Sequence, residues 1–116
     1  MAGFTPNPWK NDGAYQHDNT NNTFLLSLDL KQKMKNTSTQ NVIYCPPNYG
    51  PTFGDGHDLY LADKCNANMS SYCNFPYRFN CNGQYSSGQA SFTAFCGAVS
   101  GYNYSVLEYE VFRVIY

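Results

Sequence analysis

The stretch that decides the fold class runs Phe24-Leu25-Leu26-Ser27-Leu28-Asp29-Leu30. Its even-numbered positions are all large and apolar, whereas its odd-numbered positions are mixed. Side chains alternate between the two faces of a β-strand, so this pattern predicts a half-buried strand. The three lysines that follow at a spacing of two are interpreted as the solvated exit from this strand; they are Lys31, Lys33 and Lys35.

Further segments of β-branched, aromatic or alternating residues predict more strands. They span residues 41–45, 59–62, 91–99 and 102–116, with a short strand near 77–79. No segment repeats apolar residues at the spacing that an amphipathic helix of ten or more residues needs. The fold is therefore predicted to be mainly β with little helix. Without crossover helices its sheets should be antiparallel, in a sandwich or barrel with long irregular loops.

The composition indicates one domain without a polyanionic partner. The 116 residues are 42% hydrophobic, 17% aromatic and only 13% charged, with a net charge of -1. A chain of this length supports one core, and it has no basic excess to attract nucleic acid. Its N-terminus does not resemble a secretory signal, and no window is apolar enough to span a bilayer. We therefore expect a cytoplasmic protein without membrane insertion.

The cysteines are odd in number, so any set of disulfides leaves one thiol over; they are Cys45, Cys65, Cys73, Cys81 and Cys96. A reducing compartment favours buried or half-buried free thiols. Their spacing lacks the short pairs that structural zinc sites use, so no metal or other cofactor is expected. Cys65 is the redox candidate, for a peroxide sensor or scavenger, because Lys64 is the only lysine beside a cysteine and positive charge favours the thiolate.

Four Asn-X-Ser/Thr sequons keep a second compartment open. They begin at Asn21, Asn36, Asn68 and Asn103. In a secreted chain such sequons predict surface glycans, although several arise by chance in a sequence rich in Asn, Ser and Thr. A secreted, disulfide-bearing binding module is therefore an alternative.

The stretch from Asn48 to Asp58 contains three glycines, Gly50, Gly54 and Gly56. It lacks the Gly-Lys-Ser/Thr ending of a phosphate-binding loop and precedes a strand, so a structural loop is the better interpretation. His57 and Asp58 are adjacent, and adjacent residues of a strand point to opposite faces, so a catalytic pair is not expected.

Near the C-terminus, Glu108 and Glu110 share one face of the predicted strand, about 7 Å apart at two residues' rise. Hydrolases also use paired carboxylates, but an outward-facing pair on a strand is more often solvated or part of a docking surface. The sequence therefore predicts no catalytic residues.

Several of these motifs resemble those of the TLDc domain, the module of the oxidation-resistance protein family. The matching segments are Gly3-Phe4-Thr5 with Trp9, Phe24 to Leu28, Tyr49 to Leu59, Ser70-Ser71-Tyr72, Tyr102-Asn103-Tyr104, and Glu108 to Val114. The central and C-terminal segments are the most specific. The resemblance spans nearly the whole chain.

The resemblance implies a two-sheet β-sandwich and a non-enzymatic role in oxidative-stress resistance. In several family members this role involves binding the vacuolar proton-pumping ATPase. The binding surfaces expected here are the motif loop and the acidic strand face, namely Gly50, Gly54, Gly56, His57, Asp58, Glu108 and Glu110. Residues 1–116 would form one TLDc-like domain that lacks the N-terminal part of the family's domain. That departure predicts an exposed sheet edge and possible homo-oligomerisation.

Overall fold

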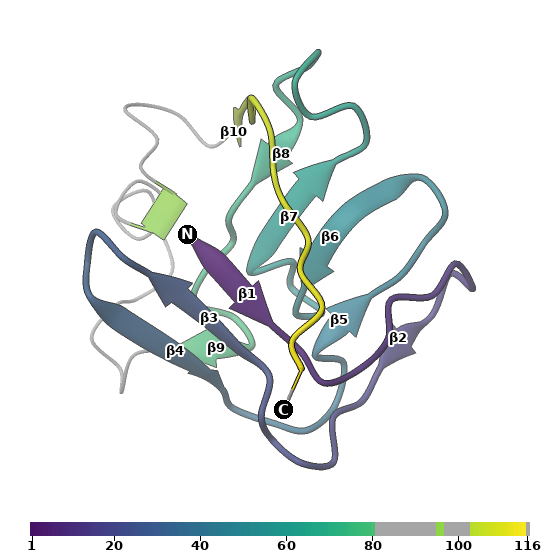
Figure 1. Ribbon diagram of the computed structural model, residues 1–116, viewed down its shortest axis with the longest axis vertical. Helices are drawn as coiled ribbons and strands as arrows, with labels where there is room; N and C mark the ends of the chain where they lie inside the picture. The colour runs from purple at the N-terminus through teal and green to yellow at the C-terminus, as the bar shows by residue number, and fades with distance from the viewer. Residues whose placement is uncertain (81–94, 97–102, 116) are drawn as a thin grey trace.

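The computed structural model describes residues 1–80, 95–96 and 103–115, which form two antiparallel sheets (Figure 1). The four-stranded sheet has the order β1 (Ala2–Phe4), β3 (Phe24–Ser27), β4 (Gln32–Asn36), β9 (Phe79–Asn80). The six-stranded sheet has the order β10 (Asn103–Tyr104), β8 (Ser71–Tyr72), β7 (Leu59–Ala62), β6 (Tyr49–Phe53), β5 (Ile43–Tyr44), β2 (Tyr15–Gln16). The mainly β, antiparallel two-sheet fold is as predicted.

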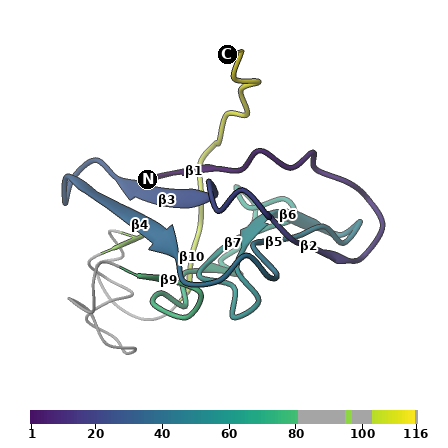
Figure 2. The same cartoon turned by 90° about the horizontal axis from the view of Figure 1, so that it is seen from below.

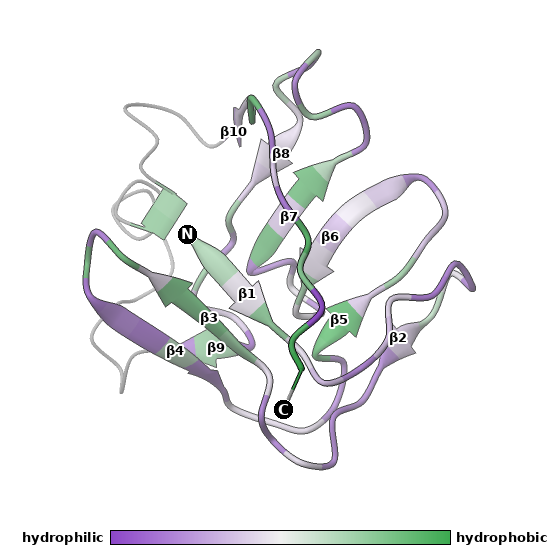
Figure 3. Ribbon diagram, in the orientation of Figure 1, coloured by the Kyte–Doolittle hydropathy of each residue, from purple (hydrophilic) through white to green (hydrophobic). Residues whose placement is uncertain are grey.

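The core is built from both sheets. Leu25 and Met34 come from the four-stranded sheet, and Ile43, Phe53 and Leu59 come from the six-stranded sheet. All five side chains are buried, and the hydropathy colouring of Figure 3 shows the apolar character of β3, β5 and β7. Burial of such side chains is the main stabilising contribution to a chain of this size.

β3 is the strand predicted from Phe24 to Leu30, but it is shorter and ends at Ser27. Its fully buried residues are Leu25 and Ser27, whereas Leu28 lies exposed in the turn that follows. The richer apolar face thus points outward, where Phe24 stacks on Phe4. Aromatic stacking accounts for an apolar residue on this outer face.

The sequence predicted that the three lysines form the solvated exit from this strand, and the structure places them differently. Lys31 has a positive φ of 52° in the turn, and Lys33 and Lys35 lie on the exposed face of β4. β4 pairs with β3 in a hairpin, and its buried face carries Met34. The strand therefore turns back on itself before the lysines, which become the polar half of an alternating strand.

The glycine-containing stretch is a loop only in part. Residues 49–53 form β6, which pairs with β5 and β7 and has a register shift between Tyr49 and Thr52. The turn is confined to residues 54–57, and β7 has the predicted bounds. The shift between Tyr49 and Thr52 accommodates Pro51, which has no N–H to donate to a ladder.

Two other predicted strands differ from the structure. Of residues 91–99, only Phe95 and Cys96 lie within the described residues, and both are helical. Of residues 102–116, the structure describes 103–115; among these, Asn103 and Tyr104 form a strand, residues 105–115 belong to none, and residues 107–115 are exposed. The strand expected over residues 105–115, with Glu108 and Glu110 on one of its faces, is therefore wrong, because no strand of the described chain lies beside it.

Within the described ranges, no helix has the length and apolar character to cross a membrane.

Candidate functional site

The turn at residues 54–57 joins β6 to β7, is tied to the residue that precedes β5 and is closed by a hydrogen bond of its own. The N–H of Gly54 donates to the carbonyl of Val42 at 2.9 Å, and the N–H of His57 donates to the carbonyl of Gly54 at 3.2 Å. Gly54 has a φ of 80°, a conformation that glycine adopts without steric strain. A Cβ at this position would lie 2.1 Å from Oδ1 of Asp58. Glycine therefore allows the carboxylate of Asp58 to approach the turn.

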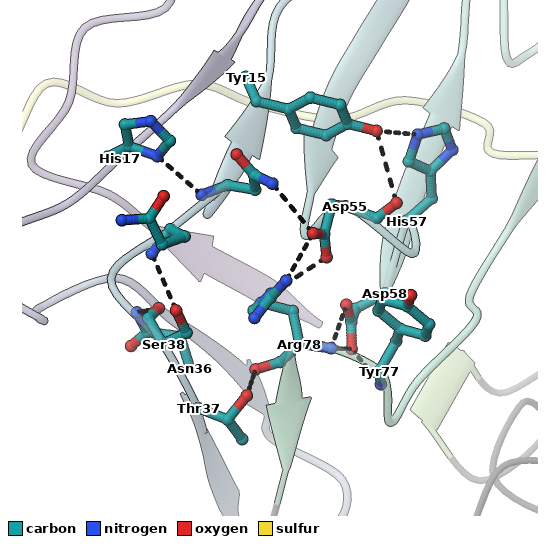
Figure 4. A network of polar contacts seen from close by, with 12 residues as sticks. Tyr15, His17, Asn36, Thr37, Ser38, Asp55, His57, Asp58, Tyr77 and Arg78 are labelled. Carbon is teal, nitrogen blue, oxygen red and sulfur yellow. Dashed lines mark hydrogen bonds and ion pairs between the residues drawn. The ribbon is translucent and has the colours of Figure 1, made fainter.

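Asp58 is buried and binds the chain that leads into β9. Its oxygens accept the backbone N–H groups of Tyr77 at 2.7 Å, Arg78 at 2.9 Å and Phe79 at 3.0 Å (Figure 4). Burial raises the pKa of Asp58 to about 6, because the loss of solvation outweighs the stabilising effect of the three amides. Asp58 thus connects the turn to the other sheet through a carboxyl group whose pKa lies well above its ordinary value.

Asp55 forms the second polar connection to the same segment. Its Oδ1 accepts a hydrogen bond from Nε of Arg78 at 3.0 Å, and its Oδ2 accepts one from the side-chain amide of Asn41 at 3.0 Å. Figure 4 shows Arg78 lying between Asp55 and the backbone held by Asp58. Burial alone would raise the pKa of Asp55, but the bonds from Arg78 and Asn41 outweigh it and lower the pKa. The ion pair between Asp55 and Arg78 thus ties the turn to the segment that leads into β9.

The ring of His57 lies among tyrosines and not beside Asp58. Its Nδ1 is 2.8 Å from the hydroxyl of Tyr72, and its Nε2 is 3.4 Å from the hydroxyl of Tyr15. Burial lowers the pKa of His57, so the neutral imidazole is favoured. Both ring nitrogens have phenol partners, and the backbone carbonyl accepts the N–H of Asn74 at 3.1 Å. The arrangement locks the ring in place and provides no carboxylate to orient it for base catalysis.

Sequence reasoning missed the tyrosines that surround His57. They come from five strands and are Tyr15, Tyr44, Tyr49, Tyr60 and Tyr72. Ring centroids of Tyr44, Tyr49 and Tyr60 lie 5.7, 5.8 and 5.9 Å from that of His57. The positions of Tyr44 and Tyr60 in predicted strands were a usable signal, since they alternate with the core residues Ile43 and Leu59.

The other two motif glycines are also sites of close packing. A Cβ on Gly50 would lie 2.7 Å from the carbonyl oxygen of Leu61, and one on Gly56 would lie 2.1 Å from the ring of Tyr77. The motif glycines therefore shape the loop and the adjoining strand. No anion-binding geometry is needed to explain them.

Glu108 and Glu110 do not join the motif loop in one polar cluster. Both lie on the exposed chain after β10, and Glu108 borders a cleft of about 300 Å³ with Lys64 and Cys65. Gly50 and Tyr109 meet in a second cleft of about 250 Å³, which Trp9, Tyr44 and Tyr49 also line. Aromatic rings from three separate segments thus converge at the end of the β5–β6 hairpin.

The cysteines correct one expectation and leave another untested. A disulfide joins Cys73 to Cys96, with Cα atoms 6.3 Å apart, so these two are not free thiols. Cys45 and Cys65 are free and buried, whereas Cys81 lies outside the described residues. The neighbouring Lys64 is exposed. The redox role of Cys65 remains a prediction. No cluster of three metal-ligating side chains occurs among the residues with described positions.

Comparison with known families assigns the chain. The family model described as the TLDc domain matches residues 1–115. The protein therefore belongs to the TLDc domain family, and this membership points to a function related to oxidative stress. No curated protein and no solved structure matches the chain significantly.

Proposed function

We propose that the chain is a non-enzymatic protein-interaction domain that acts in oxidative-stress resistance by binding the vacuolar proton-pumping ATPase from the cytoplasm. The observation that carries this proposal is the exposed segment from Leu107 to Ile115, which contains Glu108 and Glu110. Contiguous exposed apolar residues are typical of docking surfaces. Extended segments of this kind bind partners by adding a strand or by seating alternate side chains.

The polar groups of the motif loop support docking over catalysis. Asp58 is occupied by three backbone amides, and His57 lies between two phenols. Both groups maintain the shape of the turn between β6 and β7. The loop is therefore a rigid support for a surface, and the proposal includes no metal or cofactor.

The test is a pull-down of cytosolic ATPase subcomplexes with the full chain. We expect enrichment over an unrelated β-sandwich domain and at least about a tenfold loss of affinity, roughly 1.4 kcal/mol, in the Glu108→Lys/Glu110→Lys variant. Asp29→Lys/Asp63→Lys is the matched control, because it makes the same charge change at two other exposed acidic residues. Equal recovery by the wild-type chain and the unrelated domain would overturn the proposal.

A secreted binding module is the second candidate, and the Cys73–Cys96 disulfide favours it. Among its sequons, Asn21 and Asn103 are exposed, whereas Asn36 is buried and donates to the carbonyl of Ser38 at 2.7 Å. This candidate predicts glycans at Asn21 or Asn103 and a disulfide in protein purified from its natural source. Mass spectrometry that finds five free thiols and no glycan would eliminate it.

A further inference from the structure

The rings around His57 lie on the face of the six-stranded sheet that points away from the core. Figure 2 shows β5, β6 and β7 as a layer separate from β1 and β3. Tyr44 and Tyr60 follow the core residues Ile43 and Leu59, and adjacent residues of a strand point to opposite faces. The tyrosine cluster consists of six half-buried residues, namely Tyr15, Tyr44, Tyr49, His57, Tyr60 and Tyr72. Packing of the core between the sheets therefore does not account for it.

Hydrogen bonds within the cluster give the phenol of Tyr72 a proton acceptor. The hydroxyl of Tyr15 donates to the carbonyl of Asp55 at 3.4 Å, so its oxygen accepts from Nε2 of His57 at the same distance. The tautomer assigned from these contacts leaves Nδ1 of His57 without a proton, and Nδ1 accepts the hydroxyl of Tyr72 at 2.8 Å. Burial lowers the pKa of His57, which favours this neutral ring. Tyr72 therefore has a base within reach for its proton.

Ring contacts connect Tyr72 with the protein surface. Trp9 is 39% exposed and lines the cleft of about 250 Å³ together with Tyr49. Ring centroids are 4.7 Å apart between Tyr49 and Tyr60, and 4.9 Å apart between Tyr60 and Tyr72. Electrons move rapidly between aromatic rings at such separations, and an oxidised indole takes an electron from a phenol near neutral pH. An electron removed from Trp9 is thus replaced from the tyrosines.

We propose that the tyrosine cluster supplies one electron to peroxyl radicals at the protein surface, with Trp9 as the point of entry and Tyr72 as the terminal donor. The peroxyl radical takes an electron from Trp9, and the resulting peroxide anion takes a proton from solvent. Tyr72 returns an electron to Trp9 through the rings of Tyr60 and Tyr49. The O–H bond of Tyr72 breaks as its proton moves to Nδ1 of His57. An ascorbate-type reductant then gives one electron to the phenoxyl radical, and His57 returns the proton.

Pulse radiolysis with the azide radical tests this electron relay, because that oxidant prefers tryptophan and the chain contains a single one. In the full chain, the indolyl radical of Trp9 should decay into a phenoxyl radical with a first-order rate that is independent of protein concentration. Tyr60→Phe interrupts the path with a ring that is not oxidised, so the transfer should slow at least about tenfold. Tyr77→Phe is the matched control, since it makes the same change at a 63% exposed tyrosine outside the cluster.

Electron paramagnetic resonance locates the phenoxyl radical. Replacing Tyr72 by fluorotyrosine changes one ring hydrogen only, and it adds fluorine hyperfine splitting to the spectrum if the radical resides there. We expect this splitting with the label at position 72 and none with the label at position 77. In the labelled chain, His57→Asn removes the proton acceptor and should remove the splitting. Asparagine suits this position because it tolerates the positive φ of 56°.

Peroxyl radicals from a thermally decomposing azo initiator, with ascorbate present, test the quenching itself. Tyr60→Phe should lose the fluorescence of Trp9 faster than Tyr77→Phe. Bimolecular decay of the indolyl radical, equal transfer rates in these two variants, or a phenoxyl radical that is not on Tyr72 would overturn the proposal. The relay does not rest on the proposed docking function, because the pull-down measures binding without an oxidant. Failure of either experiment leaves the other conclusion standing.

Discussion

At the scale of single residues, Asp58 shows how the motif loop combines a structural role with sensitivity to pH. Its carboxylate, just before β7, accepts hydrogen bonds from the backbone N–H groups of three consecutive residues that lead into β9. The close approach depends on Gly54, which has no side chain to block it. A sequence alone reveals the glycine and the aspartate but not the amides, because the partner segment lies about twenty residues further on.

The raised pKa of Asp58 predicts a pH-dependent stability. Its pKa is about 6 in the folded chain and about 3.9 in an unfolded one. Protonation is therefore favoured by folding, so its stabilising effect is complete below about pH 4 and is lost as the pH rises through 6. The loss should be about 3 kcal/mol in the free energy of unfolding, since each pKa unit corresponds to about 1.4 kcal/mol.

Urea denaturation between pH 4 and 7.5 measures this loss, and Asp58→Asn is the reference because it cannot titrate there. Subtracting the variant's profile removes the contribution of His57, which both chains share. A direct NMR titration of the Asp58 carboxyl in the wild-type chain covers the case in which the variant does not fold. The free energy of unfolding of the wild-type chain minus that of Asp58→Asn should fall as the pH rises. If this difference is constant with pH, or increases as the pH rises, the prediction is contradicted.

At the scale of elements, the strands are easier to predict than the faces they bury. Alternation located β3 because period-two patterns arise from the geometry of the backbone itself. Which face of β3 is buried depends on the neighbouring sheet: Leu25 belongs to the core cluster with Phe53, whereas Phe24 and Leu26 face outward. The stack of Phe4 on Phe24 is a long-range pairing that no local pattern indicates.

Alanine substitutions in β3 and its turn test this assignment. Leu25→Ala removes a fully buried side chain and should lower the free energy of unfolding by about 2–5 kcal/mol through lost burial and a cavity. Leu28→Ala makes the same chemical change at a side chain that is 69% exposed and should change it by less than about 0.5 kcal/mol. Chemical denaturation measures both. A loss at Leu28 as large as that at Leu25, or larger, would contradict the burial of Leu25 and the exposure of Leu28.

At the scale of the whole molecule, the sequence indicated the two sheets and the family. It did not indicate the disulfide or the conformation of residues 107–115. The mainly β composition and the motif order were sufficient for the two-sheet fold and the TLDc membership. They were not sufficient for the disulfide, because five cysteines permit many pairings. They also failed for residues 107–115, where strong strand propensity meets no neighbouring strand. Propensity specifies what a segment can form, and the rest of the molecule decides whether it does.

The Cys73–Cys96 disulfide supplies the last prediction, and it bears on the compartment in which the chain works. The bond links Cys73, which directly follows β8, to Cys96 in the helical residues 95–96, across a separation of 23 residues. Closing a loop of that length restricts the unfolded chain, so Cys96→Ser should lower the free energy of unfolding by about 3 kcal/mol in oxidising buffer. Reductant should lower that of the wild-type chain by the same amount and leave the variant unchanged. Cys65→Ala, which alters a free thiol, is the control and should keep its response to reductant.

If wild type and Cys96→Ser unfold at the same urea concentration in oxidising buffer, the bond does not stabilise the fold, and the case for a secreted module loses its main support. If the predicted difference appears, a reduced chain in the cytoplasm must rely on the core between the sheets, where Phe75 stacks on Phe95 at 5.0 Å beside the same two cysteines.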